Sequence, residues 1–128
     1  MKHVAYAIGG LILAFILFVN LVNAPRKREL DRKNRENADR ILRALRAYQH
    51  DHGTYPEELS RLEPDYLKPV PARLAYPGDT AGSPFHYVAA ENGKSFTIGY
   101  WEAPIGMFPS DLEATYDSST GAWKTEER

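Results

Sequence analysis

The chain has no cysteine among its 128 residues, which excludes a disulfide framework, a cysteine-based zinc site and thiol chemistry. It has no glycine-rich phosphate loop, because Gly78 and Gly82 are isolated turn residues. No serine lies in a nucleophile-elbow motif, and acidic pairs such as Glu126-Glu127 lie in polar, exposed settings. The sequence therefore predicts no enzyme and no catalytic, cofactor-binding or metal-binding residue.

Acidic residues are absent before Glu29, and Lys2 is the only Lys or Arg before Arg26. Residues 4–22 form an uncharged apolar run, which as a helix nearly matches a hydrocarbon core of about 30 Å. We therefore predict a transmembrane anchor over residues 1–24. The alternative is a signal peptide cleaved after Ala24, because residues 22–24 have the small-x-small pattern. Pro25 directly after that bond makes a poor signal-peptidase substrate.

Charge is unevenly distributed along the rest of the chain. Residues 26–46 contain nine Lys/Arg and four Asp/Glu, whereas residues 47–128 contain six and thirteen. In the first stretch an acid precedes a base by four residues, the favoured order on a helix, in the pairs Glu29–Lys33, Asp31–Arg35, Glu36–Arg40 and Asp39–Arg43. This pattern indicates a self-paired, solvated helix and no nucleic-acid binding. Its bases can still contact anionic lipid headgroups beside the anchor.

The apolar residues of the same stretch predict an amphipathic helix over residues 25–53. They recur with helical spacing in one stripe, with Leu42 beside it; the stripe is Ala38, Ile41, Leu45, Tyr48 and His52. Gly53 is suited to end the helix in a left-handed cap. Pro25 can either begin a second helix or kink one continuous helix.

Two histidines, His50 and His52, lie at the end of this predicted helix. Residues two apart on a helix project about 200° from one another, so the pair is poorly placed to hold one metal ion. Metalloprotease histidines on a helix are four apart and come with a glutamate. We therefore expect His50 to be exposed, His52 to be half-packed, and both to mark the helix end, where the dipole favours positive charge.

Residues 54–128 are expected to complete one folded domain that begins at residue 25. Thr54 and Glu57 match a capping box, which predicts a short helix to about Leu62. Residues 63–84 contain five prolines and two glycines and predict an irregular loop. Two hairpin patterns follow, around residues 92–93 and around Gly121. The predicted fold class is α+β, with a long N-terminal helix packed on a three- or four-stranded antiparallel sheet.

Alternation within the first hairpin predicts which face of the sheet is buried. The buried face is expected to carry Phe96, Ile98 and Tyr100, which alternate with Thr97, Gly99 and Trp101. We expect this face to pack on the long helix. His86 shares a face with Val88 and is expected to be a packed histidine.

The order of these features resembles type IV pilin-like proteins, and most closely the pseudopilins of type II secretion. An apolar helix runs into an amphipathic one, Gly-x-Tyr-Pro closes it, and a Pro-rich loop leads into a C-terminal meander. The resemblance is carried by Tyr48, Gly53, Tyr55, Pro56, Leu59, Leu62, Tyr66, Leu67, Pro69 and residues 82–87 (GSPFHY). It covers about residues 40–125. It implies a pilin-like fold, a role in type II secretion or pilus-type assembly, and other envelope or pilin-like proteins as partners.

The sequence departs from these families in two places. Family members have a basic leader ending in glycine, followed by Phe-Thr-Leu-Ile-Glu or similar, whereas here Gly10 precedes Leu-Ile-Leu-Ala-Phe with no glutamate. Secretion pseudopilins also bind calcium in a C-terminal loop. The acidic and hydroxyl residues here lack recognisable ligand spacing, and we expect a solvated hairpin loop; they are Asp111, Glu113, Asp117, Ser118 and Ser119.

Two arguments predict opposite membrane orientations. Lys2 precedes the span and six Lys/Arg occupy residues 26–35, so the positive-inside rule places the domain in the cytoplasm. The resemblance places it on the periplasmic side of a bacterial inner membrane, and we give it the greater weight. The expected function is that of a single-pass, pseudopilin-like envelope protein with a structural or interaction role, with an oligomer left open. The alternative is an exported soluble module, released after Ala24, that binds a ligand or inhibits a partner.

Overall fold

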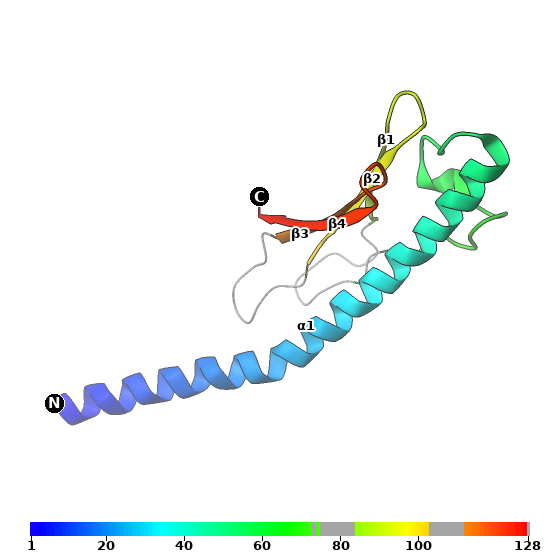
Figure 1. Cartoon of the computed structure of the whole chain (residues 1–128). Coiled ribbons are helices and arrows are strands. Elements are labelled where there is room, and N and C mark those ends of the chain that lie inside the picture. The colour runs from blue at the N-terminus through cyan, green and yellow to red at the C-terminus, as the bar shows by residue number, and fades with distance from the viewer. Residues whose placement is uncertain (73, 75–83, 103–111, 128) are drawn as a thin grey trace.

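One long helix and a four-stranded antiparallel sheet form the main part of the structure (Figure 1). The computed structural model describes residues 1–72, 74, 84–102 and 112–127. In chain order the elements are α1 (Lys2–His52), the 3₁₀ helix η1 (Leu59–Leu62), β1 (His86–Ala89), β2 (Phe96–Trp101), β3 (Leu112–Asp117) and β4 (Ala122–Glu127). This arrangement confirms the predicted α+β class and gives the sheet four strands.

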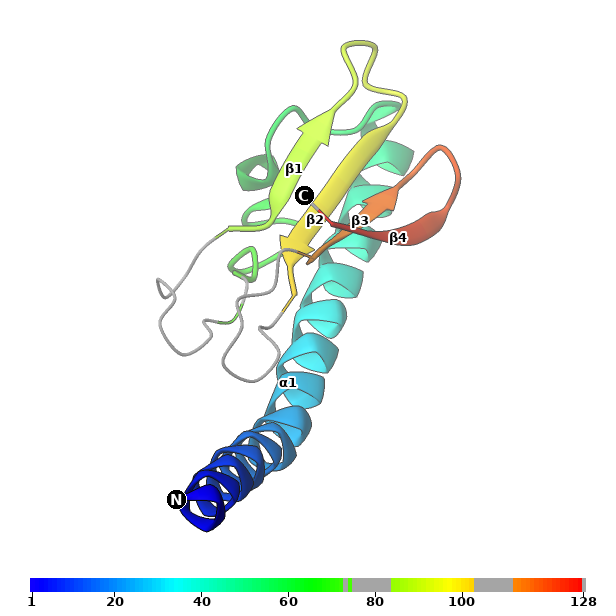
Figure 2. The same cartoon turned by 90° about the vertical axis from the view of Figure 1, so that its left-hand side faces the viewer.

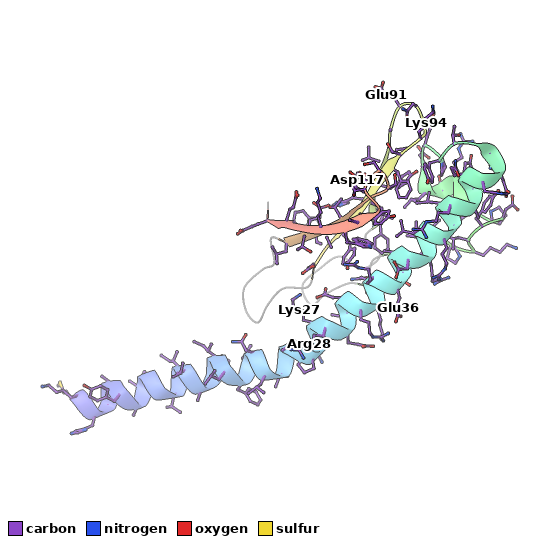
Figure 3. The ribbon with its side chains drawn as sticks, viewed as in Figure 1. Lys27, Arg28, Glu36, Glu91, Lys94 and Asp117 are labelled. Atoms are coloured by element: carbon purple, nitrogen blue, oxygen red, sulfur yellow. The ribbon has the colours of Figure 1, made fainter. Side chains whose placement is uncertain are left out.

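Helix α1 is a single helix of 51 residues that includes Pro25, which decides between the two expectations for this proline. The helix axis changes direction near Lys27 and Arg28, which Figure 3 labels. Proline lacks an N–H and its ring crowds the carbonyl four residues earlier, so a bend beside it is expected. The helix ends as predicted at Gly53, which has φ 82° and donates its N–H to the Gln49 carbonyl at 2.7 Å.

The two halves of α1 have different surroundings. None of the described elements lies beside the N-terminal half of α1, which is coloured blue. In contrast, β1 and β2 lie across its C-terminal half (Figures 1 and 2). Large apolar side chains are exposed along the whole first half of α1. Near its start, Val4 is 62% exposed, and near its end, Leu21 is 74% exposed. This half is long and apolar enough to cross a membrane.

The second half of α1 carries the core on the predicted stripe. Ile41 and Leu45 are fully buried because they face the inner side of the sheet. The remaining buried apolar residues are Ala38, Leu42 and Ala44 from α1, Leu62 from η1, and Phe85, Phe96, Ile98, Tyr100, Ala114 and Tyr116 from the sheet region. Phe96, Ile98 and Tyr100 thus pack as expected, and the helix and sheet form one hydrophobic core.

The stripe ends earlier than predicted. Tyr48 is partly buried, but His52 is exposed, so the expectation of a half-packed His52 is wrong. His52 is the last residue of the helix, and its ring stacks on the Tyr48 ring with 4.0 Å between the ring centroids. His50 is exposed, as predicted.

The sheet is a simple meander, in the order β1-β2-β3-β4. Ile98 on the central strand β2 lies opposite Tyr87 on β1 and Tyr116 on β3. Gly93, with φ 65°, closes the β1–β2 loop by donating its N–H to the Ala90 carbonyl at 2.8 Å. Both predicted hairpins are therefore present, and one face of the sheet covers α1 while the other faces away from it.

The short helix begins at Leu59, so the prediction of a helix opened by a Thr54 capping box is wrong. The preceding residues are bound to the β1–β2 hairpin instead. The Tyr55 N–H donates to the Gly93 carbonyl at 2.8 Å, and the Tyr87 hydroxyl donates to the Pro56 carbonyl at 2.7 Å. These tertiary hydrogen bonds outweigh the local capping pattern. The described part of the Pro-rich stretch, residues 63–72, 74 and 84, contains no helix or strand, as expected.

Candidate functional site

The apolar half of α1 is the first candidate interaction surface. Its exposed large apolar side chains lie on all sides of the helix; they include Tyr6, Ile8, Leu11, Ile12, Leu13, Phe15, Leu17 and Phe18. A soluble monomer rarely exposes an apolar surface of this extent. The helix is thus a candidate membrane span near the N-terminus.

The junction between span and domain is held by Lys27. Its ammonium contacts the Asp31 carboxylate at 2.6 Å and Glu102 at 3.6 Å, with Lys27 side-chain exposure of only 21%. Glu102 directly follows β2, so this contact ties the helix to the end of the sheet. No local pattern in the sequence indicates it, because the two residues are 75 positions apart.

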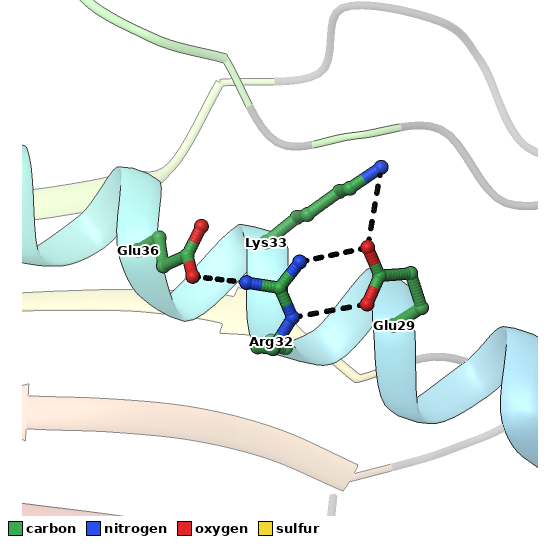
Figure 4. A network of polar contacts seen from close by, with 4 residues as sticks. All are labelled: Glu29, Arg32, Lys33 and Glu36. Atoms are coloured by element: carbon green, nitrogen blue, oxygen red, sulfur yellow. Dashed lines mark hydrogen bonds and ion pairs between the residues drawn. The ribbon is translucent and has the colours of Figure 1, made fainter.

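Four charged residues beyond the junction form a network on α1 (Figure 4). Arg32 binds Glu29 at 2.7 Å and also pairs with Glu36, while Lys33 lies 3.4 Å from Glu29. The Arg32 hydrogen bond lowers the pKa of Glu29 to about 2. Because all four charges are exposed, the network maintains a solvated helix surface and contributes little to stability.

The predicted helix ion pairs are therefore only partly present. Glu29–Lys33 forms, but Glu36 pairs with Arg32 rather than Arg40. Within the described ranges, neither Arg40 nor Arg43 forms an ion pair or hydrogen bond. The spacing rule misses these outcomes because one long guanidinium can reach acids in both directions along the helix.

The Arg35 side chain extends from α1 to the sheet. Its guanidinium lies 3.8 Å from the centroid of the Trp123 ring on β4, and its Nε donates to the Tyr100 hydroxyl at 3.4 Å. Burial raises the pKa of Tyr100, while the hydrogen bond from Arg35 acts in the opposite direction. This cation–π contact fixes the edge strand to α1.

At the end of the domain that adjoins the candidate span, Arg26 and Arg28 are exposed and form no ion pair with any described residue. They lie just after Pro25, which follows the apolar half of α1. Guanidinium groups at this position are suited to the phosphates of lipid headgroups.

The far end of α1 carries the histidines that the sequence singled out. His50 Nδ1 lies 3.3 Å from Asp51, and His52 Nδ1 lies 3.0 Å from the Tyr48 carbonyl. Asp51 also accepts a 2.7 Å hydrogen bond from the Tyr66 hydroxyl. The two imidazoles thus have separate partners. Among the described residues no group of three His, Cys, Asp or Glu side chains is arranged to hold a metal ion.

The acidic C-terminal loop is built around Asp117. Its carboxylate accepts hydrogen bonds from the Ser119 N–H at 2.8 Å and hydroxyl at 2.6 Å, and the hydroxyl bond is the main cause of its lowered pKa. These bonds form the β3–β4 turn that was expected. Glu113 lies away from this turn on β3, and Asp111 lies outside the described residues.

The outer face of the sheet carries a hollow of about 400 Å³, which we call the acidic hollow. It is lined by His86, Thr97, Gly99, Glu113, Glu126 and Glu127, among others. His86 and Val88 share a face, as predicted, but this face points away from α1 and both residues are exposed. The expectation of a packed His86 is therefore wrong. Alternation along a strand shows which residues share a face of the sheet. It does not show which of the two faces packs on the helix.

Gly99 shapes the floor of the acidic hollow. A Cβ at this position would lie 3.0 Å from Thr115 Oγ1 and 3.1 Å from Glu113 Oε1. The absence of a side chain lets the Glu113 carboxylate lie across the sheet, where its side chain is only 13% exposed and His86 Nδ1 lies 2.9 Å away. Trp101 packs edge-on to His86 at 6.3 Å.

A second hollow of about 300 Å³ lies along α1, and we call it the basic groove. It is lined by Arg40, Arg43, Ala44, Ala47, Tyr66 and Leu67. Among the described lining residues, Ala44 and Ala47 are small, and the charged side chains are those of the exposed Arg40 and Arg43. Both hollows depend on tertiary arrangement, so the sequence alone did not reveal them.

Comparison with protein-family models, curated proteins and solved structures found no match to this chain.

Proposed function

We propose that this protein is a single-pass envelope protein with a structural or protein-interaction role, similar to the pseudopilins of type II secretion. One observation carries the proposal: the exposed apolar half of α1 continues without a break into the helix that forms the domain core. A cleavable signal needs no rigid connection to the mature fold. A helix shared by the span and the core instead holds the domain at a fixed position beside the bilayer.

The surfaces of the domain support a binding role rather than catalysis. The acidic hollow and the basic groove are open and charged, and such surfaces suit contacts with other proteins. The partners we propose are other envelope or pilin-like proteins. The helix carrying Tyr48 and Gly53, followed by Tyr55 and Pro56 and a meander sheet, is the arrangement that the pilin-like resemblance implies.

We further propose that the domain lies on the periplasmic side of a bacterial inner membrane. The basic residues after the span favour the cytoplasmic side, and the pilin-like resemblance favours the periplasm. In the structure Lys27 and Arg32 are bound to acids, although acids count for little in the orientation rule. The proposed side therefore rests on the resemblance.

An alkaline phosphatase fusion after Arg128 tests this orientation, because that enzyme is active only outside the cytoplasm. We expect high activity, and a fluorescent protein that folds only in the cytoplasm should stay dark when fused at the same residue. An inactive but full-length phosphatase fusion would contradict the periplasmic location and, with it, the pseudopilin-like role.

The mass of the mature protein separates the anchored protein from an exported module. A retained anchor predicts an N-terminus upstream of residue 25 and recovery in the membrane fraction. A soluble protein beginning at Pro25 would instead favour a secreted ligand-binding or inhibitory module.

A further inference from the structure

Three consecutive basic residues follow the apolar half of α1, and the structure separates them into two kinds. Lys27 faces the domain, where its ammonium lies 2.6 Å from the Asp31 carboxylate and 3.6 Å from that of Glu102. Arg26 and Arg28 are exposed, and neither side chain forms an ion pair or hydrogen bond with a described residue. The domain therefore occupies the middle charge and leaves the two outer guanidinium groups open to another molecule.

The helix directs these two guanidinium groups away from each other. α1 continues unbroken through residues 26–28, and Figure 3 labels Lys27 and Arg28 at its bend. Successive residues on an α-helix project about 100° apart, so Arg26 and Arg28 project to opposite flanks of α1 while Lys27 faces the sheet. Two side chains about 200° apart are poorly placed to share one small anion, so each requires a ligand of its own.

Both arginines lie at the depth of the lipid headgroups when the apolar run spans a bilayer. Arg26 is four residues beyond Val22, the last residue of that run, which is about 6 Å along a helix. Headgroups add roughly 5–8 Å on each side of the hydrocarbon core. Arg28, at about 9 Å, reaches the same layer because a long basic side chain can fold back toward the interface. Arg40 of the basic groove is about 27 Å along the helix, beyond this layer.

The acids nearest to the two arginines along α1 are already paired. Glu29 lies 2.7 Å from Arg32 and 3.4 Å from Lys33, and Asp31 is bound to Lys27. These carboxylates therefore do not compete for the two guanidinium groups. Within the described residues, the positive charge of both arginines is left uncompensated at the level of the headgroups.

We propose that Arg26 and Arg28 each bind the phosphate of an anionic phospholipid, one lipid on each flank of α1. A guanidinium can bind a phosphate through two parallel hydrogen bonds. A headgroup that carries no ammonium, such as that of phosphatidylglycerol, keeps a net negative charge and is favoured over a zwitterionic one. The inference rests on the membrane anchor of the proposed function, but not on its periplasmic side or its protein partners.

Native mass spectrometry of the full-length protein in a neutral detergent tests this site. The protein is titrated with phosphatidylglycerol and, separately, with phosphatidylcholine of the same acyl chains. We expect two phosphatidylglycerol molecules to bind, each about fivefold more tightly than phosphatidylcholine. Excess inorganic phosphate should not displace them, because the acyl chains of a lipid also contact the apolar half of α1.

Two double variants with the same loss of charge locate the site. Arg26→Gln with Arg28→Gln should abolish the preference for phosphatidylglycerol, whereas Arg40→Gln with Arg43→Gln should leave it within about twofold of wild type. Each single change, Arg26→Gln or Arg28→Gln, should remove one of the two bound lipids. All four positions are exposed, so these variants should fold, and unchanged circular dichroism checks this.

Several outcomes would overturn the proposal. Equal losses in the two double variants would show attraction by net charge alone. Equal binding of both lipids by the wild type would show that no anionic-lipid site exists, and displacement by inorganic phosphate would indicate a site for free phosphate. An inactive phosphatase fusion would reject the periplasmic location without changing binding in detergent, so the two failures are distinguishable.

Discussion

The hydrogen bond from Tyr66 to Asp51 links the end of α1 to the segment after η1. It measures 2.7 Å and is the main cause of the lowered pKa of Asp51 and of a Tyr66 pKa raised to about 12. The folded-state pKa of Asp51 lies below its ordinary 3.8, so its contribution to stability is present above that pH and is lost as the pH falls. For Tyr66, the contribution is lost as the pH rises from 10 toward 12.

Replacing Tyr66 with Phe removes this donor. We expect the pKa of Asp51 to rise toward its ordinary value, while His50 maintains a smaller lowering. Carboxyl NMR titration of Asp51 measures the change. Tyr87→Phe is the matched control, because that hydroxyl donates to the Pro56 carbonyl instead. An Asp51 pKa unchanged in Tyr66→Phe would show that this hydrogen bond does not cause the shift.

Residue contacts were predictable from the sequence only where they are local. Glu29–Lys33 is four residues apart and forms as expected. Arg35 on Trp123 and Lys27 on Glu102 join residues far apart in the chain, and no spacing rule identifies such pairs. His86 shows the same limit, since its parity was predictable but the covered face of the sheet was not.

Packing of α1 on the sheet is the main stabilising contact between elements. Leu45 is fully buried, so Leu45→Ala leaves a cavity and should lower the free energy of unfolding by about 2–5 kcal/mol. Urea unfolding of the full-length protein in detergent micelles measures this loss. Val88→Ala, on the outer face with 66% exposure, should change stability by less than about 0.5 kcal/mol. Equal stability of Leu45→Ala and wild type would contradict the observed packing.

The apolar half of α1 should tolerate apolar changes but not charge. Ile12 is 55% exposed and lies near the middle of the predicted span, so Ile12→Lys should make membrane insertion about 3 kcal/mol less favourable. Alkaline carbonate extraction would then release a fraction of the protein from membranes. Ile12→Leu should remain fully membrane-bound, and equal release of both variants would argue against a transmembrane helix.

Elements were predicted well where their signals are strong and continuous. The stripe on α1, the Gly53 cap and both hairpins follow from periodicity and turn chemistry. The helix predicted after Thr54 failed because Tyr55 and Pro56 bond to the β1–β2 hairpin. Neither hollow could be predicted, since each joins side chains from separate elements.

The whole molecule consists of a compact helix–sheet domain and a projecting apolar helix. Because the candidate span is not buried inside the structure, deleting residues 1–24 should change the free energy of unfolding by less than about 0.5 kcal/mol while releasing the domain into the soluble fraction. Thermal unfolding monitored by near-ultraviolet circular dichroism measures this. A shortened domain that fails to fold would show that the anchor contributes to the core.

The continuity of α1 also has a mechanical consequence. Transmembrane helices are tilted from the bilayer normal by about 20° on average, and a span that is longer than the local hydrocarbon thickness can tilt further to fit. The helical residues after Pro25 extend for roughly 40 Å, so a tilt of this size would displace the far end of the domain by about 14 Å. The helix would then act as a lever that converts a local change in lipid thickness into lateral movement of the sheet.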